Sequence, residues 1–120
     1  LRLPVTAGSV KRYKENMAEI AGPKGAHVIS IYDGKVVEIK RNRITNKYDV
    51  FVAHGEYITS YANMGSICVE KGQKVARNEQ LGTIGSSGNI MTMENEDKLV
   101  FGIYPPNPGM KLRAENCFKR

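Results

Sequence analysis

Hydrophobic and polar residues alternate along most of the chain in short runs, and glycine interrupts these runs every several residues. Alternation with period two is typical of strands that bury one face, whereas an amphipathic helix repeats near 3.6 residues. Many short strands of this kind predict an all-β fold, an antiparallel sandwich or barrel-like sheet. The clearest runs cover residues 27–32, 35–39, 48–53, 57–61, 67–69, 80–84 and 98–104.

Two of the turns between these runs predict β-hairpins. Asp33-Gly34 is a strong two-residue turn signal, so residues 27–32 should pair with 35–39. The runs at 48–53 and 57–61 should form a second hairpin around the glycine at position 55. One or two helical turns within residues 10–20 are the only helix expected, and the prolines after residue 104 predict an irregular tail.

Length and composition indicate one compact core. A chain of 120 residues with 41% hydrophobic content is too short for two cores, so residues 1–120 are expected to form a single domain. No stretch approaches the run of about 18 apolar residues that a membrane-spanning helix needs. The sequence starts at Leu1 without an initiator methionine, which is compatible with a mature form or a piece of a longer protein.

The net charge leaves several partners open. The chain has 18 Lys and Arg against 12 Asp and Glu, a formal +6, which suits nucleic acid, an anionic membrane, an anionic cell-wall polymer or an acidic protein. The short basic stretches at 11–12 and 40–43 lack the interleaved aromatics and glycines of an RNA-binding strand, so no nucleic acid is expected. Cys68 and Cys117 are expected to be free thiols, with one bridge as the alternative in an exported protein.

Several blocks of the sequence are similar to the LytM, or lysostaphin-like, zinc peptidases. They occur in the family's order and cover most of the chain between Leu3 and Leu112. The strongest match is the run from Gln80 to Gly88. The blocks are residues 22–28, 33–37, 53–64, 69–75, 80–88 and 99–103.

The resemblance also implies that the zinc site of the family has been lost. Active members hold zinc with two histidines and one aspartate and leave a fourth position for a water. In this sequence the first histidine falls on Glu15 and the aspartate on Glu19. The paired histidines of the closing strand fall on Lys98 and Val100, and a further catalytic histidine falls on Asn63. The resemblance therefore implies a protein that is not an enzyme, with no metal, no catalytic residue and no cofactor.

His27 and His54 are the only histidines in the chain. Neither lies in an HxH or HExxH spacing, so a structural role is favoured over a rescued zinc site. Loss of the metal would leave Glu15 and Glu19 without a counter-ion, and Lys98 is expected to place its ammonium within ~4 Å of one of them. The alternative is that all three side chains point into water.

The family frame implies a vestigial groove that could bind a partner. Its expected aromatic lining is Tyr57, Tyr61 and Tyr104, although each could equally be a strand residue packed on its neighbours. The segment 89–97, with Ile90, Met91 and Met93, could form one rim. The full set of candidate groove residues is Glu15, Glu19, Tyr57, Tyr61, Asn63, Lys98, Val100 and Tyr104.

LytM-like proteins without zinc ligands resemble the EnvC and NlpD type of murein hydrolase activators. The resemblance therefore implies an exported protein of the periplasm or cell envelope that activates an N-acetylmuramoyl-L-alanine amidase during daughter-cell separation. Activation would require different affinities for the closed and open states of the amidase. The alternatives are a passive peptidoglycan-binding module and, less favoured, a metallopeptidase with unusual ligands.

Overall fold

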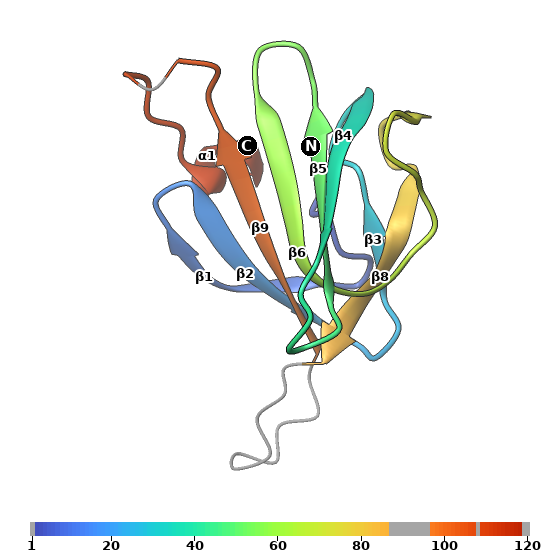
Figure 1. The fold of residues 1–120 in the computed structure, drawn as a ribbon. Coiled ribbons are helices and arrows are strands. Elements are labelled where there is room, and N and C mark those ends of the chain that lie inside the picture. Colours follow the sequence, from blue (N-terminus) through green and yellow to red (C-terminus); the bar gives the residue numbers. More distant parts are fainter. Residues whose placement is uncertain (1, 87–96, 108, 119–120) are drawn as a thin grey trace.

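A computed structural model describes residues 2–86, 97–107 and 109–118 of the chain. Within these residues the fold consists of nine strands and one short helix (Figure 1). Most of the segment expected as a groove rim, residues 89–96, lies outside the described part. The strands are β1 (Ser9–Lys14), β2 (Met17–Gly22), β3 (His27–Ile29), β4 (Gly34–Arg41), β5 (Tyr48–Ala53), β6 (Ile58–Ile67), β7 (Lys74–Val75), β8 (Gln80–Ser86) and β9 (Asp97–Tyr104), and the helix is α1 (Ala114–Phe118).

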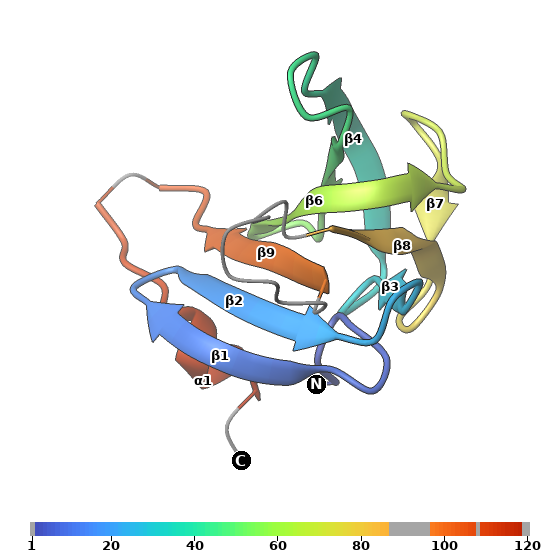
Figure 2. The same cartoon turned by 90° about the horizontal axis from the view of Figure 1, so that it is seen from below.

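All strands join one antiparallel sheet, which confirms the all-β expectation. The order along the sheet is β1-β2-β9-β8-β6-β5-β4-β7, and β3 pairs with β8. β6 also pairs with β9 through residues 58–62 before it passes to β8 through residues 64–67. The register shifts between Met64 and Ser66, and such an irregularity bends a strand. In Figure 2 the arm of β1, β2 and β9 therefore stands at a steep angle to β4.

The core lies on the inner face of this bent sheet. One row of directly paired residues crosses four strands as Tyr13, Ala18, Phe101 and Tyr61, and the last three are at most 2% exposed. Phe118 of α1 closes the row, with its ring 5.3 Å from that of Phe101 in an edge-to-face contact. Figure 1 shows α1 behind β9, on this inner side. Burial of a large apolar side chain contributes about 1.5–3 kcal/mol, so this row is a main source of stability.

The segment expected as a helix is instead the hairpin of β1 and β2. Its turn lies at Glu15, which has a φ of 54°, and Asn16. Ala18 and Ile20 are buried, while Glu19 between them is partly exposed. This alternation of burial with period two is typical of a strand. The tail is also more ordered than expected, because α1 forms there and the Ala114 backbone N–H donates to the Glu15 carbonyl at 3.0 Å.

The first predicted hairpin is wrong and the second is confirmed. β3 pairs with β8, and β4 pairs with β5 and β7, so residues 27–32 and 35–39 do not pair with each other. The Asp33 carboxylate accepts a hydrogen bond from Arg77 N–H at 2.7 Å, and a Cβ on Gly34 would meet the Ala53 carbonyl oxygen at 2.5 Å. The dipeptide therefore serves long-range packing rather than a tight turn. β5 and β6 form the second hairpin as expected.

Two further expectations concern the thiols and the membrane. Cys68 and Cys117 are both free thiols, as expected. In the described part of the chain, no helix has the length and apolar character to span a bilayer.

Candidate functional site

The outer face of the sheet carries positions that the sequence analysis assigned to the candidate groove. Directly paired residues share a face, and one row crosses β1, β2, β9 and β6 as Arg12, Glu19, Val100 and Ala62. A shallow cavity of about 210 Å³ opens on this row, lined by Arg12, Lys14, Met17, Ala18, Glu19 and Val100. Glu19 therefore lies between a guanidinium on one neighbouring strand and an isopropyl group on the other.

Arg12 is the functional-site residue that sequence reasoning missed. Its Nε lies 2.9 Å from Glu19 Oε2, and the two side chains are 65% and 37% exposed. An exposed pair of this kind contributes about 0–1 kcal/mol to stability, so its main effect is on the charge of the cavity. Pairing of β1 with β2 would have placed Arg12 beside Glu19. The sequence analysis expected a helix in this segment and therefore did not predict that pairing.

Lys98 was expected to be the counter-ion of Glu15 or Glu19, and the structure shows a different partner for Glu19. Lys98 is on the same face, two residues from Val100 along β9 and opposite Ala21, but the ion pair of Glu19 is formed with Arg12. Glu15 does not share this cavity, because it lies at the β1–β2 turn and lines a separate cavity of about 530 Å³. The structure therefore brings Glu19 and Val100 together, with Lys98 beside them, and places Glu15 elsewhere.

Asn63 has a structural role in place of the expected groove contact. Its Nδ2 donates to the carbonyl of Lys98 at 2.8 Å and lies 3.4 and 3.3 Å from the carbonyls of Gly85 and Ser86. Its φ of 71° is in the left-handed region, which asparagine tolerates better than most residues. The amide thus ties β6 to β8 and β9 at the point where β6 changes partner.

Only one of the three candidate tyrosines lies on the outer face. Tyr61 is fully buried on the inner face, contrary to the expectation that it lines the groove. Tyr57 precedes β6, stacks on His54 with ring centroids 4.8 Å apart and packs against the core. Tyr104 is 37% exposed and lies over Gly102, where an added Cβ would be 3.0 Å from its hydroxyl oxygen.

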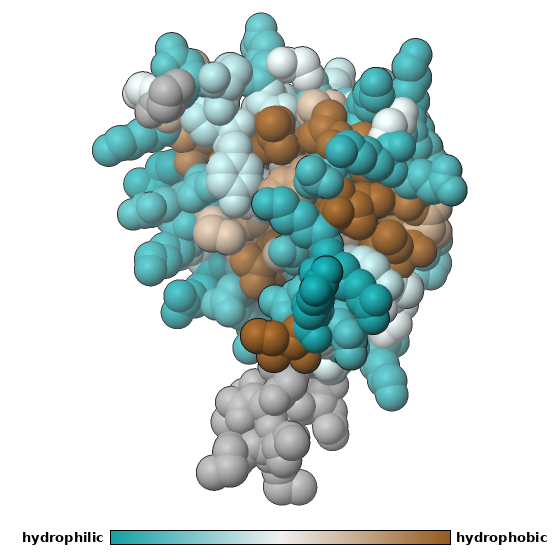
Figure 3. All heavy atoms as spheres, in the orientation of Figure 1, coloured by the Kyte–Doolittle hydropathy of each residue, from teal (hydrophilic) through white to brown (hydrophobic). Residues whose placement is uncertain are grey.

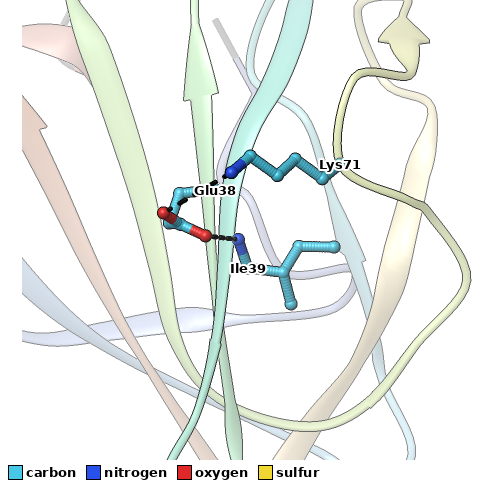
Figure 4. A network of polar contacts seen from close by, with 3 residues as sticks. All are labelled: Glu38, Ile39 and Lys71. Atoms are coloured by element: carbon cyan, nitrogen blue, oxygen red, sulfur yellow. Dashed lines mark hydrogen bonds and ion pairs between the residues drawn. The ribbon is translucent and has the colours of Figure 1, made fainter.

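A second row extends the outer face across the whole bend. It runs through Phe51, Ser60, Gly102 and Met17, with Lys14 at the β1 end and Glu38 at the β4 end. Glu38 Oε1 accepts from the Ile39 N–H at 3.1 Å, and its Oε2 lies 4.0 Å from Lys71 Nζ (Figure 4). In Figure 3 apolar residues gather across the middle of this face with hydrophilic residues around them. The outer face is thus an apolar strip that is cationic at β1 and holds a paired carboxylate at β4.

The side chains at the vestigial site do not fit the zinc of the family. The carboxylate of Glu19 is bound by a guanidinium, and Val100 offers no ligand atom. No group of three His, Cys, Asp or Glu residues suited to a metal occurs among residues 2–86, 97–107 and 109–118. His27, at the start of β3, is exposed, and His54 lies in the β5–β6 turn, so neither joins Glu19.

His54 is part of a polar network inside that turn. Its Nδ1 lies 2.8 Å from the Asp33 carbonyl oxygen, which can only accept, so Nδ1 carries a hydrogen. Its Nε2 lies 2.7 Å from Thr59 Oγ1, and Thr59 Oγ1 lies 2.8 Å from Tyr61 Oη. The Ile31 N–H donates to the same Oη at 3.2 Å. The network links the β3–β4 connection, the β5–β6 turn and the core.

This burial makes stability depend on pH. Desolvation lowers the pKa of His54 below 6.5, against the smaller opposing effect of the Asp33 carbonyl. Between the lowered folded pKa and 6.5 the unfolded chain binds more protons, so stability falls as pH decreases through this window. We expect urea midpoints to decrease as pH is lowered from neutral through 6.5. His54→Gln should flatten the dependence, and an unchanged slope in this variant would contradict the assignment.

Comparisons with known proteins agree with the fold. The model of peptidase family M23 matches residues 13–111. The chain is 33% identical over 87 residues to peptidoglycan DD-endopeptidase ShyB of Vibrio cholerae, covering 72% of this chain and 20% of that protein. It is 35% identical over 89 residues to cell division protein DipM of Caulobacter vibrioides, covering 72% and 14%. A crystal structure of a zinc-containing peptidase from Vibrio cholerae superposes with a TM-score of 0.67 at 26% identity, covering 92% and 35%.

The chain spans a fifth or less of the length of these two curated relatives. One of these longer proteins is named a peptidoglycan DD-endopeptidase and the other a cell division protein. The family model covers most of the chain, including β2, β9 and the positions of Glu19 and Val100. The chain belongs to peptidase family M23, and its fold is that of the LytM-type peptidases.

Proposed function

We propose that this protein is a non-catalytic M23 protein of the bacterial cell envelope that activates a cell-wall amidase. The observation that carries the proposal is the pairing of Glu19 with Arg12 opposite Val100. The one carboxylate retained at the family's ligand positions near Val100 is thus engaged by a cation of the chain itself. No imidazole lies beside it among the described residues, so this site is not expected to activate a water for peptide hydrolysis.

The outer face offers what a regulatory contact needs. Its centre is apolar, with Met17, Val100 and Tyr104 partly exposed, and its β1 end carries Arg12 and Lys14. A strip of this kind suits a segment of a partner that has an apolar side and acidic residues at one end. Activation follows if that segment blocks the amidase when free, because binding to the outer face then favours the open state.

Release of dye from labelled peptidoglycan tests the proposal directly. We expect no release by the protein alone, with or without added zinc, and release when a purified amidase from the same organism is added. Release by the protein alone that a chelator abolishes would overturn the proposal in favour of a metallopeptidase with unusual ligands. Absence of release in the presence of the amidase would also overturn it.

A pair of tyrosine variants tests whether the outer face makes the contact. Tyr104→Ala should lower the amidase-dependent rate about tenfold, because truncation of a central aromatic contact typically costs 1–2 kcal/mol or more. Tyr13→Ala is the matched control, since both tyrosines are 37% exposed and Tyr13 belongs to the row on the inner face. Equal effects of the two variants on activation, at equal stability, would exclude the outer face as the contact.

The second candidate is a passive peptidoglycan-binding module. The net charge of +6 and the exposed ring of Tyr104 support it, because both suit an anionic, sugar-rich polymer. This candidate predicts that the protein sediments with insoluble peptidoglycan and leaves the rate of the amidase unchanged.

A further inference from the structure

The turn between β4 and β5, residues 42–47, presents an isoleucine to water. Ile44 is 94% exposed, whereas the next most exposed large hydrophobic residue among those described, Met110, is 52% exposed. A single exposed apolar residue is common on protein surfaces, so the setting of Ile44 decides whether it has a role. Two features of that setting point to a ligand.

The first feature is the set of hydrogen bonds that holds the turn. Asn42 Oδ1 accepts from the N–H groups of Ile44 and Thr45 at 2.9 and 3.1 Å. Asn46 N–H donates to the Asn42 carbonyl at 2.8 Å, and Lys47 N–H donates to Thr45 Oγ1 at 3.2 Å. Because these bonds fix the backbone, Ile44 is held outward and little entropy remains to be lost on binding.

The second feature is the concentration of positive charge around the isoleucine. Residues 40–49 contain Lys40, Arg41, Arg43 and Lys47 against Asp49, a net of +3 and half of the chain's formal +6. The first three of these cations are exposed, and the fourth is partly exposed. Figure 2 shows the β4–β5 turn projecting from the body, and Figure 3 shows a small apolar area among hydrophilic residues at this end of the molecule.

We propose that the β4–β5 turn is a contact for an anionic lipid surface. Ile44 enters the boundary between headgroups and acyl chains, while the surrounding lysines and arginines meet the lipid phosphates. The apolar tip distinguishes this partner from a nucleic acid, because residues 40–47 contain no aromatic ring on which a base could stack. It also distinguishes a membrane from a dissolved anionic polymer, which has no apolar layer to receive the isoleucine.

The expected binding is weak and reversible. One isoleucine and a few cations supply much less than a lipid anchor or a spanning helix. The contact therefore orients a protein that is already close to the membrane and turns its β4–β5 end toward the lipid. It does not depend on the amidase proposal, since the turn lies apart from the row of Glu19 and Val100.

Vesicle co-sedimentation measures the contact and its charge dependence. We expect binding to phosphatidylcholine vesicles that contain phosphatidylglycerol and none to phosphatidylcholine alone. Arg43→Gln should weaken binding about fivefold, since each cation near the surface contributes about 1 kcal/mol. Lys24→Gln, an equal change of net charge at an exposed site in the β2–β3 connection, should have a much smaller effect. Equal losses of vesicle binding in the two variants would mean that binding depends on net charge and not on this turn, and would overturn the proposal.

The role of the isoleucine is tested separately. Ile44→Ser should weaken vesicle binding about tenfold, the effect of removing one large apolar side chain from lipid, and should leave binding to soluble polyglutamate unchanged. An Ile44→Ser variant that binds vesicles like the parent protein would overturn the proposal in favour of an acidic polymer or protein.

A tryptophan reporter gives a direct readout of insertion. The chain contains no tryptophan, so Ile44→Trp introduces a single indole. We expect its emission to shift to shorter wavelength with anionic vesicles and to be quenched by brominated acyl chains. Met110→Trp, which places the indole at a different exposed site, should show neither change. If the emission of Ile44→Trp with anionic vesicles remained that of an indole in water, the proposal would be overturned.

Discussion

Gly82→Ala is expected to lower the free energy of unfolding by about 3 kcal/mol or more. Gly82 lies in β8 at the place where β6 and β3 pair with it on either side. An added Cβ would overlap the carbonyl oxygen of Ser66 and come within 2.9 Å of the Ile67 Cα. Both obstacles are backbone atoms in a strand pair, so no side-chain rotation relieves the overlap.

Thermal and urea unfolding followed by circular dichroism measure this loss. Gly109→Ala is the matched control, because the nearest atom to its added Cβ is 3.5 Å away, an ordinary contact. The control should change stability by less than about 0.5 kcal/mol. A Gly82→Ala protein with the stability of that control would mean that β6 and β8 do not approach as closely as described.

Asn63→Ala is expected to cost about 2–3 kcal/mol. The substitution removes the amide donor to the Lys98 carbonyl and leaves that carbonyl without this partner. It also places an alanine at a φ of 71°, which adds about 1 kcal/mol of backbone strain. Because this amide joins β6, β8 and β9, its loss should loosen the strands on which the outer face is built.

Two further variants separate these causes. Asn63→Gly accommodates the positive φ and removes only the amide. It should therefore destabilise the protein by about 1 kcal/mol less than Asn63→Ala does. The greater chain entropy of glycine in the unfolded state reduces this difference. Asn63→His introduces the side chain of active family members and should also be destabilising, because an imidazole does not reproduce the amide's donor geometry. Equal unfolding midpoints for the parent protein and Asn63→Ala would refute the structural role of this residue.

Local periodicity predicted the strands better than their pairing. The runs around 48–53, 80–84 and 98–104 are strands because their alternation matches burial of one face. The Asp33-Gly34 turn misled because a two-residue signal ignores distant neighbours, here Arg77 and the backbone of Ala53. The β1–β2 hairpin was missed since its residues favour neither period clearly until β9 covers one face.

The sequence predicted a site residue only where the family pattern fixes the position of that residue along the chain. Glu19 and Val100 were assigned from the family pattern, and the structure pairs them directly across β2 and β9. Arg12 could not, since its approach to Glu19 depends on a hairpin that the local pattern left ambiguous. Tyr61 was assigned to the wrong face because β6 buries both Thr59 and Ser60 beside it, which hides the alternation.

In the ion pair of Arg12 and Glu19, the carboxylate charge on the outer face is balanced by a cation of the protein itself. A carboxylate that depends on a divalent cation changes its state with the supply of that cation and with any competing chelator. Here the compensating charge is a guanidinium attached to the neighbouring strand by covalent bonds, so it does not dissociate from the site. The surface around Glu19 is therefore expected to keep the same electrostatic character in metal-poor and metal-rich surroundings.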